Sequence, residues 1–130
     1  MTSIETHAHA ETLAAVLPTL QVRDITEDVA AALAAVEPQS GIAFLRGEPG
    51  TLIRVQERES GFFCDVEELM SRFVATEQAD RVRYLSMLLG PGTEQVPFND
   101  RKLCLGQWQH VMLFDLAGQS RSDWSLSVVG

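Results

Sequence analysis

The sequence lacks the features that mark several large classes of protein. No apolar stretch approaches the ~20 residues of a transmembrane helix, and the first twenty residues lack the basic start and apolar run of a signal peptide. Basic residues are also few, since ten Lys and Arg stand against eighteen Asp and Glu for a net charge of −8. That balance argues against a surface for nucleic acid or for an anionic membrane. We therefore expect a cytoplasmic protein with no nucleic-acid partner and no membrane partner.

Cysteine and the common cofactor motifs are equally scarce. Cys64 and Cys104 are the only two cysteines, and neither has a neighbour at metal-ligand spacing. A disulfide between them is one interpretation, but two buried thiols in a reducing compartment are the simpler one. There is no Walker loop, no GxGxxG and no GxSxG motif. The sequence thus indicates no cofactor.

Histidine gives no clear site either. His7 and His9 share one face of a predicted strand, a spacing that metal sites sometimes use, but no third ligand is near them in the sequence. We therefore predict no metal site. His110 lies in a predicted strand beside Gln109, where a packed or exposed strand residue is a more common role than a catalyst.

The chain has a length and a hydrophobic pattern that fit one domain over residues 1–130. Period-two alternation and apolar runs predict strands over 3–9, 20–24, 42–46, 51–57, 93–98, 102–105, 107–116 and 122–129. Helical spacing predicts helices over 27–36, 60–75 and 78–89. This order of elements is typical of an α+β domain with mostly antiparallel strands and two to three helices.

Two details of the helices can be compared directly with a structure. Thr26 is a good N-cap residue for the first helix. In the second helix, the apolar stripe of Phe62, Val66, Leu69 and Phe73 predicts the buried face.

A specific order of features runs along most of the chain. It consists of Asp24-Ile25-Thr26, Val55-Gln56-Glu57, Leu88-Leu89-Gly90, Val96-Pro97, Asn99-Asp100, the segment LCLGQWQ over 103–109, and Asp115 in the following strand. From about Asp24 to Gly130, this order resembles the YjbQ-like family, also described as secondary thiamine-phosphate synthase enzymes. The LG.WQ segment is the most specific part of the resemblance.

The resemblance implies a compact α+β sandwich that assembles as a homotrimer, with a site between subunits. It also implies a weak thiamine-phosphate synthase activity, which joins a pyrimidine diphosphate to a thiazole phosphate. The retained positions make Glu57, Gln109 and Asp115 the catalytic candidates. Trp108 and Arg121 are candidates for substrate binding.

The family's histidine positions are not kept. Glu48 falls on the histidine that opens the family's HTTAAL motif, Asp80 and Tyr84 fall on its "N…H" pattern, and a third histidine has no counterpart. A neutral imidazole exchanges protons near pH 7, whereas Glu48 is anionic. A site formed by Glu48, Glu57, Asp80 and Tyr84 would be acidic and would repel a pyrophosphate unless a cation intervened.

Three hypotheses follow from these substitutions. The first is a trimeric binding or structural module that keeps the scaffold without the synthase activity. The second is a weak transferase of the thiamine-phosphate type that uses the substituted residues. The third is a divalent-cation site of Glu48, Glu57 and Asp80 across a subunit boundary. A small phosphorylated ligand fits the first two, because Arg81 and Arg83 flank a helix turn and could meet a phosphate, although they could equally balance Glu77.

Overall fold

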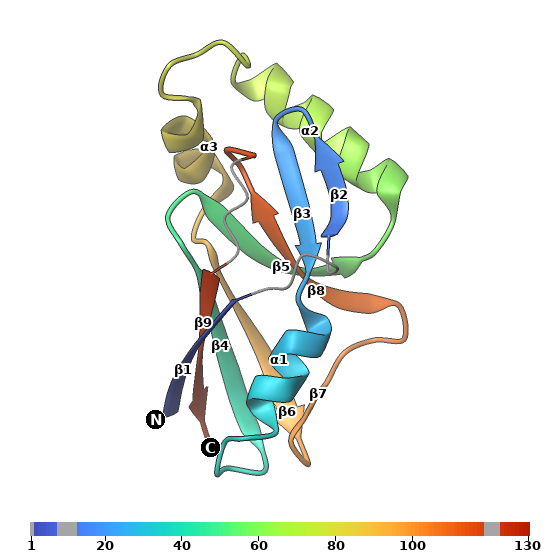
Figure 1. Cartoon of the computed structure of the whole chain (residues 1–130), viewed down its shortest axis with the longest axis vertical. Helices are drawn as coiled ribbons and strands as arrows, with labels where there is room; N and C mark the ends of the chain where they lie inside the picture. The colour runs from blue at the N-terminus through green and yellow to red at the C-terminus, as the bar shows by residue number, and fades with distance from the viewer. Residues whose placement is uncertain (1, 8–12, 119–122) are drawn as a thin grey trace.

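The computed structural model describes residues 2–7, 13–118 and 123–130, and these form nine strands and three helices (Figure 1). The strands are β1 (Thr2–His7), β2 (Leu13–Leu17), β3 (Leu20–Asp24), β4 (Gly41–Gly47), β5 (Thr51–Glu57), β6 (Thr93–Asn99), β7 (Lys102–Leu103), β8 (Gln109–Asp115) and β9 (Asp123–Val129). The helices are α1 (Thr26–Leu33), α2 (Ser60–Phe73) and α3 (Arg81–Leu89). Within these ranges no helix is long and apolar enough to cross a bilayer.

Two antiparallel sheets form the body of the chain. One has the strand order β1-β9-β4-β6-β7 and the other has the order β2-β3-β8-β5. Figure 1 shows α2 and α3 over the four-stranded sheet, with α1 beside the five-stranded one. The predicted α+β class, with mostly antiparallel strands and a sandwich-like body, is confirmed.

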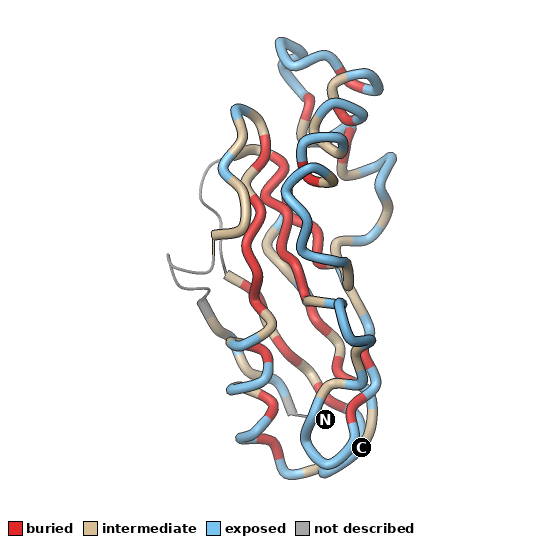
Figure 2. Tube along the Cα trace, turned by 90° about the vertical axis from the view of Figure 1, so that its right-hand side faces the viewer, coloured by how far each residue is buried: buried red, intermediate tan, exposed pale blue. Residues whose placement is uncertain are grey.

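The central strand β8 joins two hydrophobic cores. Val111 and Leu113 pack into the core between the two sheets, where α1 contributes Val29 and Leu33. Met112 and Phe114, which alternate with them, pack into the second core beneath α2 and α3. Burial on both faces explains why this segment reads as a continuous apolar run. Figure 2 shows the buried residues concentrated along these inner strands.

The α2 helix turns a different face to the core from the one predicted. Phe63 and Met70 are its buried residues, and Phe63 makes edge-to-face contacts with Phe62 and Phe114. Leu69 is 51% exposed and Phe73 is 71% exposed. The predicted stripe is therefore wrong for these two residues, since the buried stripe lies about one position along the helix.

The predicted boundaries shift where turns replace regular structure. β2 was not predicted, α1 ends at Leu33, and α3 begins only at Arg81 because residues 75–81 form successive turn hydrogen bonds. Thr26 is the first helical residue and makes no cap, since the N-cap position is Ile25.

The prediction of buried thiols is also wrong, because Cys64 and Cys104 are both exposed and unbridged.

Strand register places the candidate residues at two ends of the same strand pair. β5 and β8 pair from Glu57 beside Gln109 to Thr51 beside Asp115. The six residue steps from Thr51 to Glu57, at about 3.3 Å each, separate these ends by about 20 Å. We call them the Glu57 end and the Asp115 end.

Candidate functional site: a pocket at the start of α3

A hollow near the substituted family positions lies at the Asp115 end. It has a volume of about 570 Å³ and lies between the β2–β3 turn, the β4–β5 turn and the first turns of α3. Its wall includes Pro49, Gly50, Asp80, Arg81 and Arg83. We call it the α3 pocket. Two segments far apart in the sequence thus meet here, Pro49-Gly50 and residues 80–83, and each adjoins a position selected by the family resemblance, Glu48 and Tyr84.

Hydrogen bonds hold the loops around the α3 pocket. The backbone N–H of Leu116 donates to the carbonyl of Gly50 at 3.0 Å. Thr19 donates its N–H and its hydroxyl to Glu67 Oε2, at 2.8 and 2.9 Å, and so ties the β2–β3 turn to α2. Asp115, at 1% exposure, accepts the N–H of Ala117 at 3.1 Å. The predicted catalytic residue Asp115 therefore shapes the turn that lines the pocket.

The two arginines of the α3 pocket have different roles. Arg81 is only 6% exposed; its Nε donates to the carbonyl of Val74 at 3.2 Å, and its Nη2 lies 3.4 Å from Ser71 Oγ. Those contacts anchor the connection between α2 and α3. Arg83 is exposed, so its guanidinium can reach a ligand. A guanidinium offers the paired donors that match phosphate oxygens.

Glu48 and Tyr84 lie beside the α3 pocket without lining it. Glu48 lines a smaller hollow of about 280 Å³ together with Glu5, Arg46 and Asp123. Tyr84 is 41% exposed on α3. Glu57 is at the other end of β5, so a single chain does not assemble the four-residue acidic site of Glu48, Glu57, Asp80 and Tyr84.

The LG.WQ segment forms a tight turn at the Glu57 end. Gln109 Oε1 accepts the N–H of Gly106 at 2.7 Å, and the N–H of Gln109 donates to the carbonyl of Gly106 at 3.1 Å. A Cβ at position 106 would lie 3.0 Å from Gln109 Oε1 and would displace the amide that accepts the Gly106 N–H. Trp108 is 68% exposed at the tip. Arg121 and His9 lie outside the described residues.

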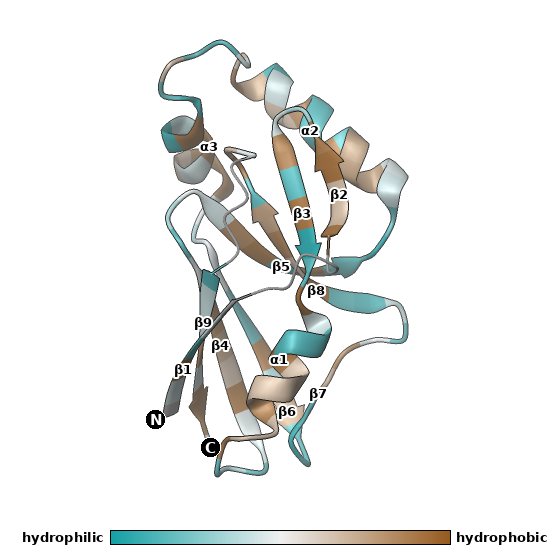
Figure 3. Ribbon diagram, in the orientation of Figure 1, coloured by the Kyte–Doolittle hydropathy of each residue, from teal (hydrophilic) through white to brown (hydrophobic). Residues whose placement is uncertain are grey.

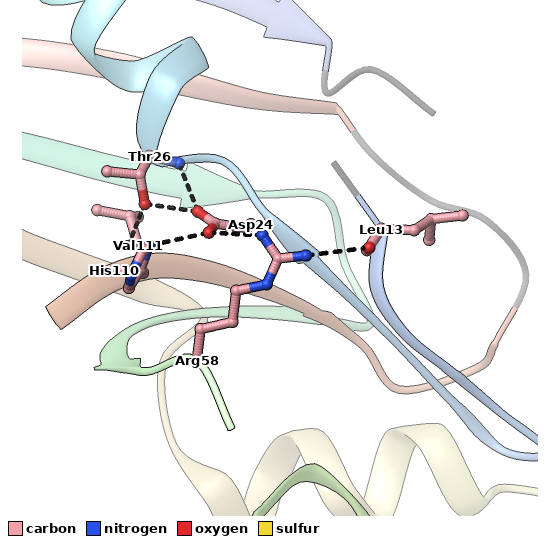
Figure 4. A network of polar contacts seen from close by, with 6 residues as sticks. All are labelled: Leu13, Asp24, Thr26, Arg58, His110 and Val111. Carbon is pink, nitrogen blue, oxygen red and sulfur yellow. Dashed lines mark hydrogen bonds and ion pairs between the residues drawn. The ribbon is translucent and has the colours of Figure 1, made fainter. Parts of the chain in front are cut away.

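A polar network at the Glu57 end was not predicted (Figure 4). Asp24, only 9% exposed, accepts the N–H and the hydroxyl of Thr26 on Oδ1, at 3.1 and 2.6 Å. Its Oδ2 lies 3.2 Å from Arg58 Nη1 and 2.9 Å from His110 Nδ1. Thr26 Oγ1 also accepts the N–H of Val111 at 2.9 Å. We call these residues the Asp24 network.

A sequence signal for part of the Asp24 network was present. The Asp24-Ile25-Thr26 segment supplied the carboxylate and the hydroxyl, but His110 joins them only because β3 pairs with β8. Figure 3 shows the hydrophilic end of β3 beside the hydrophilic start of β8. Among the residues that the structure describes, no three or more His, Cys, Asp and Glu side chains group as metal ligands.

Comparisons with known proteins give matches over most of the chain. The model of the family described as "UPF0047 protein YjbQ-like" matches residues 16–130. A structural-genomics target from C. acetobutylicum has a TM-score of 0.76 at 16% identity, with 99% of this chain and 98% of that chain covered. A YbjQ-like protein of unknown function from Sulfolobus solfataricus P2 has a TM-score of 0.77 at 18% identity, with 99% and 95% covered.

A hypothetical protein from Aeropyrum pernix K1 is similar to the same degree, with a TM-score of 0.76 at 18% identity over 99% of this chain and 97% of that one. None of the curated proteins matches the chain. These solved structures share the fold with this chain. The family match covers most of the sequence, including both segments that meet at the α3 pocket, and the chain therefore belongs to the YjbQ-like family.

Proposed function

We propose that this YjbQ-like protein is a trimeric binding module that takes a small phosphorylated ligand in the α3 pocket and lacks thiamine-phosphate synthase activity. One observation carries the proposal. The α3 pocket lies beside Glu48 and Tyr84, which stand at the aligned histidine positions, and among the described residues its lining includes Arg81 and Arg83 and no histidine. The pocket thus has groups that hold an anion, without an imidazole to transfer protons.

The charges of the α3 pocket favour an anionic ligand more than the sequence suggested. Of the four acidic-site residues, only Asp80 lines the pocket, since Glu48 faces another hollow and Glu57 is at the far end of β5. Arg81 and Arg83 outnumber that carboxylate. Ser86 adds a hydroxyl group that can donate to a phosphate oxygen, whereas the hydroxyls of Thr19 and Thr76 already donate to Glu67 and Glu77.

Arg83→Ala is expected to weaken binding of inorganic pyrophosphate by about 10- to 100-fold, because a hydrogen bond to a charged group contributes about 1.5–3 kcal/mol. Isothermal titration calorimetry measures the change. Arg72→Ala is the matched control, since Arg72 is exposed on α2, pairs with Glu68 at 2.6 Å, and does not line the α3 pocket. Equal weakening in both variants, or no binding to the wild type at millimolar pyrophosphate, contradicts the proposal.

The trimer is supported by apolar side chains on the outer faces of α2 and α3. Leu69, Phe73, Met87 and Leu88 are each more than half exposed in the single chain. Exposed apolar side chains that gather in one patch mark association surfaces in soluble proteins. We place these four side chains, called the helix patch, at the subunit contact.

Light scattering at micromolar concentration is expected to give three times the chain mass of 14.3 kDa. Met87→Glu introduces a charge into the helix patch and is expected to shift the protein toward lower mass. Gln39→Glu adds the same charge at an exposed position before β4 and is expected to leave the trimer intact. A monomer mass for the wild type rules out the trimer, and equal dissociation of both variants rules out the helix patch as the contact.

A cytoplasmic location is part of the same proposal. Cys64 and Cys104 are exposed and unbridged, a state that a reducing compartment maintains. Exposed thiols in an oxidising compartment would form mixed disulfides.

A further inference from the structure

Arg81 is buried in the wall of the α3 pocket without a counter-ion. It is only 6% exposed, and its two hydrogen bonds go to neutral acceptors, the carbonyl of Val74 and the hydroxyl of Ser71. Within the part of the chain that the structure describes, no Asp or Glu forms an ion pair with Arg81, and its Nη1 atom makes no hydrogen bond. Burial of a charge costs free energy unless an opposite charge pairs with it. An anion in the pocket would supply that partner.

The anchoring role of Arg81 accounts for only part of its guanidinium. Val74 is the C-cap residue of α2, so the contact from Nε satisfies a carbonyl at the end of that helix. A neutral donor could make the same contact, and the contact does not involve Nη1. Since Nε and Nη2 hold the guanidinium in place, Nη1 is the group that remains for an oxygen of a bound anion.

Asp80 gives the same pocket a strong hydrogen-bond acceptor. It is exposed and occupies the N-cap position of α3, where an aspartate normally accepts from the first turn of the helix. Among the described residues, however, its side chain makes no cap hydrogen bond and no ion pair. A carboxylate accepts hydrogen bonds from hydroxyl groups. The lining thus combines cationic donors with an anionic acceptor, and a ligand that carries both a phosphate and a hydroxyl group matches the two.

We infer that the ligand of the α3 pocket is a phosphate monoester of a polyol, with its phosphate on Arg81 and a hydroxyl group donating to Asp80. This inference rests on the proposed function, because it names the class of phosphorylated ligand for the same pocket. A phosphate monoester carries about −1.5 to −2 charges at pH 7, which matches the two arginines Arg81 and Arg83. The volume of about 570 Å³ is in the usual range for small-molecule sites.

Glycerol 3-phosphate and propyl phosphate test the class of ligand, because they differ only in the hydroxyl groups of the glycerol. Isothermal titration calorimetry of the full chain is expected to show glycerol 3-phosphate binding about 10-fold more tightly, since a hydrogen bond to a charged acceptor is one of the stronger kind. Asp80→Ala is expected to bring the ratio of the two dissociation constants to about one. Because Asp80 makes no cap hydrogen bond, this substitution is expected to leave α3 folded, which circular dichroism verifies.

Variants of Arg81 separate ligand binding from the anchoring role. Arg81→Met is expected to weaken binding of both esters by at least about 10-fold. Its melting temperature without ligand is expected to stay within about 5 °C of the wild type, because the loss of two hydrogen bonds is offset by the loss of an uncompensated buried charge. Arg81→Lys keeps the charge without the planar guanidinium and is expected to bind with intermediate affinity. If Arg81→Met does not fold, Arg81→Lys decides the outcome.

Failure of this inference and failure of the proposed function give different results. The inference is overturned if propyl phosphate binds the wild type as tightly as glycerol 3-phosphate, or if a folded Arg81 variant binds both esters like the wild type, while pyrophosphate binding and its loss in Arg83→Ala persist. No binding of pyrophosphate or of either ester to the wild type rejects the proposed function together with the inference. Arg72→Ala, outside the pocket lining, is expected to bind both esters like the wild type, and weakening equal to that of Arg81→Met also overturns the inference.

Discussion

Asp24→Ala is expected to lower the free energy of unfolding by about 3 kcal/mol. Asp24 is 9% exposed and accepts hydrogen bonds on both carboxylate oxygens, from Thr26 on one side and from Arg58 and His110 on the other. Alanine leaves the Thr26 groups and the Arg58 guanidinium without this partner. The effect is placed at the low end for a buried ion pair, because Arg58 is 44% exposed and regains water. Urea unfolding at one fixed protein concentration measures the change.

Two companion variants separate the role of Asp24 from a general effect of losing a carboxylate. Asp24→Asn keeps an acceptor for Thr26 but loses the charge opposite Arg58, so we expect a loss of about half that size. Glu37→Ala removes an exposed carboxylate and is expected to change the free energy of unfolding by no more than about 0.5 kcal/mol. If Asp24→Ala behaves like Glu37→Ala, the Asp24 network does not stabilise the fold.

Much of the fold could be predicted because local patterns match it. The run that became β8 is apolar over residues 111–114, and the structure buries that segment on both faces between two cores. The helices also form in the predicted segments, and α3 ends directly before Gly90-Pro91-Gly92, although α1 already ends at Leu33, before Pro38. These signals are local, so a single sequence is sufficient to detect them.

The buried face of α2 could not be predicted by the same reasoning. The helix has two apolar stripes at helical spacing, one through Phe62 and Phe73 and the other through Phe63 and Met70. Packing against β3 and β8 selects the second stripe. Tertiary contacts therefore decided between two faces that periodicity alone made equivalent.

The candidate sites depended even more on pairing between distant segments. The family resemblance selected Glu48, Asp80 and Tyr84; of these only Asp80 lines the α3 pocket, where Pro49 and Gly50 lie opposite the start of α3. His110 received no role from the sequence, since its partner Asp24 reaches it only through the pairing of β3 with β8. The order of strands in a sheet is not encoded in the hydrophobic pattern of either strand.

Thiamine-phosphate synthase turnover is expected to be at least about 100-fold lower for this protein than for an active relative that keeps the family histidines. Positioned general acids and bases contribute about 10²- to 10⁴-fold to a rate. In this chain Glu48 and Tyr84 stand at the aligned histidine positions, and no histidine lines the α3 pocket among the residues that the structure describes. Lower turnover with intact pyrophosphate binding separates the loss of chemistry from the loss of the pocket.

The most direct test of this account is a coupled thiamine-phosphate assay with both proteins at equal protomer concentration and saturating substrates. The relative's turnover is the positive control, and light scattering on the same samples verifies that both are trimers. The account predicts turnover at least about 100-fold below the relative, together with measurable pyrophosphate binding that Arg83→Ala weakens. Turnover within about tenfold of the relative contradicts it and identifies this protein as a transferase that uses the substituted residues.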